Sequence, residues 1–283
     1  MTAPTNRDGS GDDLIRASRV PIDPVTVAGL LTRPRDWTIT HVPVTGSTNA
    51  DLAASAGAPH GRVLITEEQL TGRGRSGRDW FCPGGAGLMF SVLLRLPEIP
   101  PERRGWTGAV LGVAIVRALD RVCGVRASLK WPNDVLIDGA KCAGILGEVA
   151  DDALVIGSGI NVSLRAAELP RADATSLLLA GSANDRLNRS ALLAAILDEF
   201  GDLLDRWART GGDIDLSGLR SDYLAICSTV GSRVRLVLPG GQELLALAVD
   251  VGVDGALVVE DSAGRRRSYT AADVVHLRPA PDS

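Results

Sequence analysis

Residues 130–148 read KWPNDVLIDGAKCAGILGE, and this stretch carries the clearest structural signal in the chain. The dipeptide Asp138-Gly139 between two apolar runs is typical of a two-residue β-hairpin turn. An ideal turn sets four strand pairs: Ile137 with Ala140, Leu136 with Lys141, Val135 with Cys142 and Asp134 with Ala143. Because side chains alternate between the two faces of a sheet, we expect Lys141 and Asp134 to share one face as diagonal neighbours, about 7–8 Å apart at the backbone.

The same stretch holds both lysines of the chain, Lys130 and Lys141, although lysines and arginines together number 30. Lysine is a compact point charge on a flexible stem, whereas arginine presents a broad planar fork. A narrow pocket that needs one positive charge would admit the lysine and reject the fork. The alternative is that the two lysines lie close together by chance. A general preference for arginine explains why lysine is scarce in the chain, but it does not explain where the two lysines stand. Pro132 interrupts the strand after Lys130, so the direction of that side chain stays open.

The composition is that of an ordinary globular protein with a substantial core. Of 283 residues, 45% are hydrophobic and 23% are charged, which suits one large domain and a smaller one. The formal net charge of −4 provides no overall basic field for a nucleic acid or an anionic membrane. No apolar run approaches the roughly 18 residues that span a bilayer, and the N-terminus lacks the regions of an export signal. We therefore expect a cytoplasmic protein without membrane contact.

The order of periodic segments predicts an α+β body. Three stretches have the composition of buried strands: 62–66, 88–96 and 153–162. Residues 106–122 are apolar on nearly all sides and predict a buried helix. Residues 190–207 predict an amphipathic helix that Ser190 caps and that lies on the sheet. Strands interspersed with helices, together with an antiparallel hairpin, indicate a mixed sheet with packed helices.

The chain divides into three parts by composition. Residues 1–36 begin with a polar stretch that we expect to be disordered and continue into a short helical pattern. Residues 37–227 contain the strands and helices of the predicted main domain. In residues 228–283 the period changes to two, and short apolar strands alternate with turn residues. That tail predicts a small β-barrel of about 50 residues.

Residues 71–80, TGRGRSGRDW, place three glycines between arginines directly after a predicted strand. Glycines let backbone N–H groups turn toward one point, and the forked donors of Arg73, Arg75 and Arg78 match phosphate or carboxylate oxygens. The alternative is a solvated turn, or a flexible loop that touches RNA without specificity. Because the loop is short, lies between two buried strands and ends at Trp80, an ordered anion site is at least as well supported.

Other polar residues carry weaker signals. Residues 45–52, TGSTNADL, most often form an ordinary helix cap, and a pocket of hydroxyl and amide groups is the minority interpretation. Residues 157–162, GSGINV, resemble a phosphate loop, but a GxG at a strand end is too common to identify a dinucleotide site. The three histidines and four cysteines are scattered. We expect neither a catalytic histidine nor a metal site, and the cysteines fit reduced thiols.

Two long motifs together resemble the biotin–protein ligase family. They are GRGRSGRDWFCPGGAGLMFSVLLR, which begins at residue 72, and KWPNDVLIDGAKCAGILGE, which begins at residue 130. GSTN before them and GSGINV after them fit the same pattern. The resemblance covers residues 40–210, and the β-rich tail is similar to the family's SH3-like C-terminal domain. It implies a catalytic domain like that of class II aminoacyl-tRNA synthetases.

The resemblance implies a two-step ligase reaction with ATP and biotin as substrates. The biotin carboxylate attacks the α-phosphorus of ATP, which yields biotinyl-5′-adenylate and pyrophosphate. The ε-amine of one lysine on a biotin carboxyl carrier domain, part of acetyl-CoA carboxylase or another acyl-CoA carboxylase, then attacks the adenylate and releases AMP. No metal-ligand cluster is visible in the sequence, so Mg²⁺ is expected to arrive with ATP.

The resemblance also implies roles for individual residues. Biotin would be bound by Ser47, Thr48, Asn49, Gln69, Arg73, Gly74, Arg75, Lys141 and Gly144. ATP and the adenylate would be held by Arg75, Arg78, Trp80, Lys130, Asn133, Gly159 and Asn161. Catalysis would rest on the fixed cations Lys141, Arg75 and Arg78, and Asp134 would steer or deprotonate the incoming lysine.

The sequence differs from some members of this family in two ways. Some members carry an N-terminal winged-helix domain and repress transcription, whereas only residues 1–36 precede the catalytic pattern here, so we expect no sequence-specific DNA binding. Some members also cover the adenine with an aromatic residue after the GINV segment, and residues 169–181, LPRADATSLLLAG, contain none. Two rival functions stay open: a lipoate–protein ligase, and a non-catalytic module that binds an adenylate or RNA.

Overall fold

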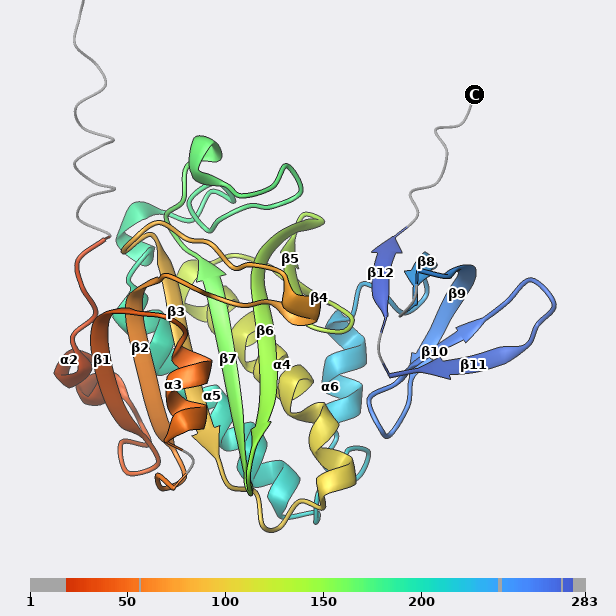
Figure 1. Ribbon diagram of the computed structural model, residues 1–283, viewed down its shortest axis with the longest axis horizontal. Coiled ribbons are helices and arrows are strands. Elements are labelled where there is room, and N and C mark those ends of the chain that lie inside the picture. Colours follow the sequence, from red (N-terminus) through yellow and green to blue (C-terminus); the bar gives the residue numbers. More distant parts are fainter. Residues whose placement is uncertain (1–18, 56, 239–240, 271, 277–283) are drawn as a thin grey trace, which may run out of the picture.

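The computed structural model describes residues 19–55, 57–238, 241–270 and 272–276, which form two units of different size (Figure 1). The larger unit is built on a seven-stranded sheet with the strand order β1-β2-β3-β7-β6-β5-β4. Strands β1 and β2 are parallel, and the other neighbouring strands are antiparallel. The predicted α+β class with a mixed sheet is confirmed. The polar stretch expected to be disordered lies outside the described residues.

The strands of the large sheet are Thr38–Thr45 (β1), Arg62–Gln69 (β2), Gly87–Leu94 (β3), Ser128–Lys130 (β4), Asp134–Ile137 (β5), Ala140–Ala150 (β6) and Ala153–Asn161 (β7). The α-helices of the described residues are Pro24–Leu30 (α2), Thr48–Ala54 (α3), Thr107–Ala118 (α4), Arg189–Ala208 (α5) and Leu219–Ile226 (α6). A short π-helix, Leu119–Cys123, continues α4. The buried strands and helices predicted from the sequence are therefore present.

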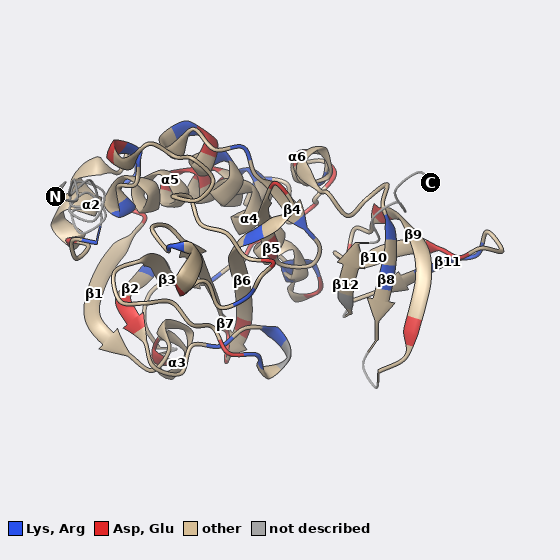
Figure 2. Ribbon diagram, turned by 90° about the horizontal axis from the view of Figure 1, so that it is seen from above, with Lys and Arg blue, Asp and Glu red and all other residues tan. Residues whose placement is uncertain are grey.

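Helices cover both faces of the large sheet. Seen from above, α4 and α5 lie on one face and α3 lies on the other (Figure 2). α5 turns one apolar stripe toward the core, formed by Leu193, Ile196, Phe200, Leu203 and Trp207, all of which are buried. β3 is buried at every position, as expected for a strand in the middle of a covered sheet.

The hairpin register agrees with the prediction only beside the turn. The observed pairs are Ile137 with Ala140, Leu136 with Lys141, Val135 with Ala143 and Asp134 with Gly144. The first two pairs agree with the prediction. The other two predicted pairs are wrong because a β-bulge between Val135 and Leu136 shifts the register by one residue. Cys142 is the extra residue of the bulge, and its fully buried thiol lies 3.5 Å from the carbonyl oxygen of Asn161. The bulge thus lets Cys142 enter the core beside Lys141.

The predicted cap of α5 is also wrong. Asn188, and not Ser190, is the N-cap, and its Oδ1 accepts a hydrogen bond from the backbone N–H of Ala191 at 3.0 Å. Serine and asparagine cap helices about equally well, so the residue pattern could not separate the two positions. The earlier start places Arg189 in the first turn of the helix, where it is buried.

The smaller unit is a five-stranded antiparallel sheet with the order β11-β10-β9-β8-β12. Its strands are Arg233–Val237 (β8), Glu243–Val251 (β9), Leu257–Glu260 (β10), Arg266–Tyr269 (β11) and Asp273–His276 (β12). All five lie in the tail whose period of two predicted a small β-barrel. The β-sheet unit is confirmed, and among the described strands its edges β11 and β12 are not paired with each other. Within the described ranges, no helix of either unit has both the length and the apolar character needed to cross a bilayer.

A buried ion pair fastens the segment before α2 to the large sheet. Arg189 Nη1 lies 2.6 Å from Glu67 Oε2, and the Arg189 side chain is 2% exposed. Arg189 also donates to the carbonyl oxygens of Gly87 and Val20, at 2.8 Å and 2.7 Å. The other carboxylate oxygen of Glu67 accepts from the backbone N–H of Ile22 at 2.8 Å. Both terminal nitrogens of Arg189 thus have a carbonyl acceptor, whereas Arg189 Nε and Glu67 Oε2 are buried without a hydrogen-bond partner among the described residues, so the ion pair alone holds Oε2.

Replacing Arg189 with methionine would remove the guanidinium from the Glu67 carboxylate and leave His41 Nε2, 3.0 Å from Oε1, as its other side-chain partner. We expect the free energy of unfolding to fall by about 3–5 kcal/mol, because breaking a buried ion pair by removal of one partner is strongly destabilising. Urea unfolding followed by circular dichroism measures this change. The control Arg235→Met removes a more exposed pair with Glu243 and should cost less than about 1 kcal/mol. Similar small losses in both variants would contradict a structural role for the buried pair.

Candidate active site

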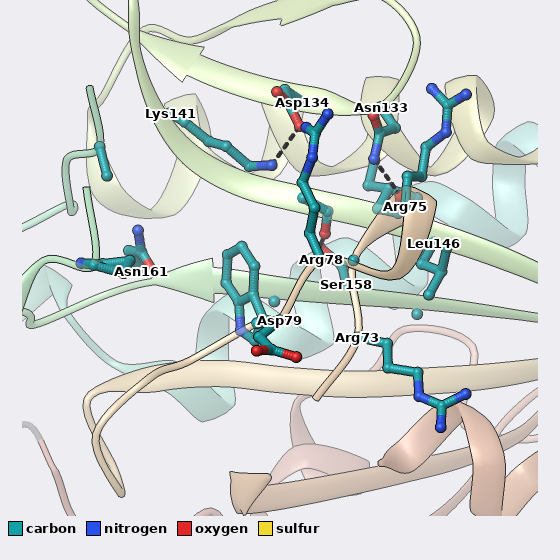
Figure 3. Close-up of a pocket in the computed structure, with 18 of the residues that line it drawn as sticks. Arg73, Arg75, Arg78, Asp79, Asn133, Asp134, Lys141, Leu146, Ser158 and Asn161 are labelled. Atoms are coloured by element: carbon teal, nitrogen blue, oxygen red, sulfur yellow. Dashed lines mark hydrogen bonds and ion pairs between the residues drawn. The ribbon is translucent and has the colours of Figure 1, made fainter. Parts of the chain in front are cut away.

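A cavity of about 690 Å³ opens between the hairpin β5–β6, strand β7 and the glycine–arginine loop of residues 71–80 (Figure 3). All residues to which the sequence assigned a role line this cavity: Ser47, Thr48, Asn49, Gln69, Arg73, Gly74, Arg75, Arg78, Trp80, Lys130, Asn133, Asp134, Lys141, Gly144, Gly159 and Asn161. They come from segments far apart in the chain. The fold therefore brings the predicted residues together around one space.

One end of the cavity is a buried set of hydroxyl and amide groups. Ser47 caps α3 and accepts a hydrogen bond from Ala50 N at 3.5 Å, so the predicted helix cap is confirmed. The next two residues also face the cavity. Gln69 Oε1 accepts from Thr48 N at 2.9 Å and from Thr48 Oγ1 at 3.1 Å. Asn49 Nδ2 donates to Glu148 Oε2 at 2.8 Å. The cap and the pocket interpretations therefore hold together.

Ser91 and Gly157, which had no predicted role, complete this end. Ser91 Oγ donates to Asn49 Oδ1 at 2.6 Å and lies 2.7 Å from Thr48 Oγ1. Gly157 leaves the space for this network, because a Cβ there would overlap Asn49 Oδ1 and lie 2.7 Å from Ser91 Oγ. A serine inside the apolar run of β3 was the available signal, since a buried strand seldom carries a polar side chain without a partner.

The glycine–arginine loop is an ordered, hydrogen-bonded turn. Gly74 N donates to Arg78 O at 2.6 Å, and Trp80 N donates to Gly72 O at 2.8 Å. Between them the chain makes a 3₁₀ turn over Arg75–Gly77, and the φ of +72° at Gly77 favours glycine. Figure 3 shows Arg78 reaching toward the side of the cavity where Asp134 and Lys141 lie, while Arg73 points the other way.

An ion pair places the ammonium group of Lys141 in the wall of the cavity. Lys141 Nζ lies 2.6 Å from Asp134 Oδ1, so the predicted neighbourhood of these two side chains is confirmed despite the bulge. The same nitrogen lies 5.8 Å from the centroid of the Trp80 ring, within the range of a cation–π contact. Gly144 makes room for it, because a Cβ there would lie 3.2 Å from Nζ.

The direction of Lys130, which the sequence left open, is set by strand pairing. Lys130 lies directly opposite Asp134 in the β4–β5 pair, so one carboxylate stands between two lysines. Burial lowers the pKa of Lys130, and the negative charges of Asp134 and Asp173 act against that shift. Lys130 and Lys141 therefore contribute positive charge to the same end of the cavity.

The indole of Trp80 packs directly on the backbone of β7 at Gly159. A Cβ at Gly159 would lie 2.6 Å from Trp80 Cζ2, so any other residue there would collide with the ring. Trp80 Nε1 and Asn161 Oδ1 are buried and have no hydrogen-bond partner among the described residues. Trp80 Nε1 packs against the backbone at Gly159, so a ligand can reach it only if the ring shifts.

The segment after β7 contributes a further wall. Lys141 N donates to Asp173 O at 2.8 Å, and Thr175 N donates to Lys141 O at 2.9 Å, so residues 173–175 run beside the hairpin. Pro170, Arg171 and Asp173, none of which had a predicted role, also line the cavity. Among the described residues, no cluster of three or more histidine, cysteine or carboxylate side chains could hold a metal ion.

Comparison with known proteins identifies the family. The model of the biotin/lipoate A/B protein ligase family matches residues 38–163, and the model of the biotin protein ligase C-terminal domain matches residues 229–277. The biotin–[acetyl-CoA-carboxylase] ligase of Mycobacterium tuberculosis is 42% identical over 240 residues, which are 83% of this chain and 87% of the relative. This chain belongs to the biotin/lipoate A/B protein ligase family.

Other members of the family agree with this placement. The ligase of the same name from Paracoccus denitrificans is 31% identical and is matched over 94% of its length and 78% of this chain. The structure of biotin protein ligase from Aquifex aeolicus in complex with biotin and ATP superposes with a TM-score of 0.70 at 25% identity. That match covers 86% of this chain and 99% of the Aquifex chain.

Replacing Gly159 with alanine should displace the indole of Trp80, because the new methyl group would overlap the ring. We expect trypsin to cleave several-fold faster after Arg73, Arg75 or Arg78, since the loop loses its contact with β7 and opens locally more often. Limited proteolysis with mass spectrometry gives the rates. Gly29→Ala is the matched control, because its Cβ would meet no atom within 4 Å. An unchanged rate in Gly159→Ala would show that Trp80 does not anchor the loop.

Proposed function

We propose that this protein is an ATP-dependent ligase that joins biotin to AMP and transfers it to a lysine of a biotin carboxyl carrier domain. The observation that carries the proposal is the Lys141 ammonium, 2.6 Å from Asp134, in the wall of a cavity with a neutral hydrogen-bonding end and an arginine loop. Family membership and the names of the relatives support the same reaction.

The neutral end of the cavity suits the polar head of biotin. We assign the ring recognition to Ser47, Thr48, Asn49 and Gln69, whose buried donors and acceptors would make a precise match to an uncharged urea-like group. Binding of the head here would send the carboxylate along β6 toward Gly144 and Lys141. Arg73, Gly74 and Arg75 would then close over the ligand with their backbone.

The charged end of the cavity suits the phosphates of ATP. The carboxylate of biotin and the α-phosphate repel each other, and negative charge grows on the transferred group as the new P–O bond forms. Arg75, Arg78 and Lys141 would hold both anions and stabilise that charge. We place adenosine beside Trp80, Gly159 and Asn161, which line this part of the cavity. Lys130 and Asn133 would complete this half.

The second step needs a lysine amine that has lost its proton. Its nitrogen forms a bond to the acyl carbon of biotinyl-5′-AMP, the bond from that carbon to the phosphate oxygen breaks, and AMP leaves. We propose that Asp134 steers the incoming amine and accepts its excess proton, because this carboxylate already binds one ammonium group at hydrogen-bond distance. Mg²⁺ would enter with ATP and share the charge of the phosphates.

We also propose that the protein works in the cytoplasm and does not bind specific DNA sequences. The four cysteines are free and buried, and burial raises the pKa of the Cys82 and Cys142 thiols to about 12, which keeps them unreactive. A nanomolar footprint on an operator would overturn the proposal about DNA.

Exchange of pyrophosphate into ATP, dependent on biotin, tests the function directly. Isotopic label should pass from pyrophosphate into ATP only when biotin and Mg²⁺ are both present, and EDTA should stop the exchange. Lipoate in place of biotin should give no exchange and no labelled carrier domain. Exchange with lipoate alone would show a lipoate ligase instead, and no exchange with either acid would favour a non-catalytic binding module.

Lys141→Ala should reduce adenylate formation by about a thousandfold while the thermal midpoint of unfolding stays close to that of the wild type. A unit charge 4 Å from its partner at an effective dielectric of 20 is worth about 4 kcal/mol, which corresponds to that factor. Lys141→Arg should not restore the rate, because the guanidinium is too broad for the space beside Gly144. Arg267→Ala, on β11 and outside the cavity wall, is the control and should keep full activity. Full activity of Lys141→Ala would refute this role.

Arg75→Gly should release the adenylate from the pocket. A charge-assisted hydrogen bond is worth about 1.5–3 kcal/mol, so we expect the adenylate to escape at least about tenfold faster. Biotin labelling of serum albumin, which has no carrier domain, measures the escaped adenylate. Arg75→Lys keeps the charge and should leak less than Arg75→Gly. Slower labelling by Arg75→Gly than by the wild type would contradict the assignment.

A further inference from the structure

One buried hydroxyl group at the junction of the two units joins three separate parts of the chain. Thr229 follows α6 and has an exposed fraction of 0%. Its Oγ1 accepts a hydrogen bond from Trp131 N at 3.0 Å and lies 3.0 Å from His276 Nε2. Trp131 belongs to the turn between β4 and β5, and His276 is the last residue of β12. The turn beside the cavity is thus tied to the small unit through one oxygen atom.

The Thr229 hydroxyl group can hydrogen-bond to both of its neighbours at once. A threonine hydroxyl has one proton to donate, and Thr229 uses a lone pair to accept from Trp131 N–H. The same oxygen lies 3.0 Å from His276 Nε2, and its own proton or its second lone pair can make this hydrogen bond, according to the tautomer of the ring. Burial, together with the positive charge of Lys130, lowers the pKa of His276, in agreement with a neutral ring.

The same turn is held on two sides. From the small unit, Gly255 O accepts a hydrogen bond from Trp131 Nε1 at 3.0 Å. From the large sheet, Asn133 Nδ2 donates to Ile145 O at 2.8 Å, and Ile145 N donates to Asn133 O at 2.9 Å. The backbone of residues 131–133 is therefore held by hydrogen bonds to β6 on one side and to the small unit on the other. Thr229 Oγ1 is the acceptor for the backbone N–H of Trp131.

This turn and the small unit both form part of the cavity wall. Lys130, Trp131, Pro132 and Asn133 line the cavity, and so do Val237, Val274 and Val275 of the small sheet. Figure 1 shows β12 and β8 as the strands of the small unit that lie nearest to β4 and β5. A shift of the small unit would therefore move the turn and alter the charged half of the cavity, while Ser47 to Asn49, on α3, would keep their places.

We infer that Thr229 is a positioning residue for the nucleotide half of the site, and that His276 couples its hydroxyl group to the small β-unit. Thr229 acts through Trp131 and lies behind the wall of the cavity. The inference rests on the proposed function and extends it, because it gives the C-terminal unit a specific mechanical role in binding ATP. It also gives a role to His276, the half-buried histidine at the end of β12.

Three variants separate positioning from simple stability. Thr229→Val keeps the shape of the side chain but leaves Trp131 N–H without its acceptor, whereas Thr229→Ser keeps the hydroxyl. Thr107→Val is the matched control, because it removes another buried hydroxyl, which donates to Arg104 O at 2.8 Å. We expect the KM for ATP in pyrophosphate exchange to rise about tenfold in Thr229→Val, the size of effect that one unsatisfied buried N–H produces. The Kd for biotin should stay unchanged, and both Thr229→Ser and Thr107→Val should resemble the wild type.

Hydrogen exchange at Trp131 N–H tests the same inference without the use of activity. This amide should exchange at least about tenfold faster in Thr229→Val than in the wild type or Thr229→Ser, because it loses its buried acceptor. An unchanged KM for ATP, an equal loss of biotin binding, or an unchanged exchange rate at Trp131 would each overturn the inference. Wild-type protein that fails to exchange pyrophosphate would sink the proposed function, and the amide measurement would still decide whether Thr229 holds the turn.

Discussion

The ion pair between Lys141 and Asp134 is the interaction on which the rest of the site depends. A flexible ammonium group gives little stabilisation to a developing anion unless it is held in place before the reaction begins. Here Asp134 holds it from β5, the Trp80 ring lies on another side, and the absence of a side chain at Gly144 leaves it room. The charge therefore points into the cavity without a large reorganisation.

The architecture supplies fixed groups from both sides of this pair. The neutral end comes from α3 and from the polar residues of β2 and β3, and the arginine loop follows β2 directly. Glycines in β6 and β7 allow these segments to approach the sheet, since side chains at Gly157 or Gly159 would collide with them. The neutral end, the arginine loop and Lys141 line one cavity. This arrangement fits a substrate with an uncharged head and a carboxylate tail. The glycines of the sheet are thus as necessary to the shape of the site as its charged side chains are.

Local sequence patterns predicted the elements and the members of the site well, and their limits are physical. The Asp138-Gly139 turn determines the two pairs beside it, but the bulge depends on whether Cys142 can enter the core, which is set by distant packing. Likewise, Asn188 and Ser190 are both good caps, and tertiary contacts of Arg189 decide between them. Many site residues came from motifs that resemble a known family, and so their grouping did not require knowledge of the fold.

The contacts between the two units could not be read from the chain. Ser91 lies within the motif that begins at residue 72 but has no role assigned by it, and Thr229 belongs to no motif. The roles of both hydroxyl groups appear only when remote segments meet. The valines of β8 and β12 that line the cavity look like ordinary core residues of a small sheet. Periodicity reports which face of a strand is apolar, but it does not report what that face covers.

The position of the Lys141 charge relative to biotin can be measured in solution by ¹⁵N NMR of the lysine ammonium groups. The chain contains only two lysines, so the spectrum has two side-chain signals, and Lys141→Arg identifies one of them by its loss. Saturation with biotin alone should shift the Lys141 signal and leave that of Lys130 nearly unchanged, because the carboxylate meets Lys141 first. A Lys141 signal that stays in place at saturating biotin would contradict the account.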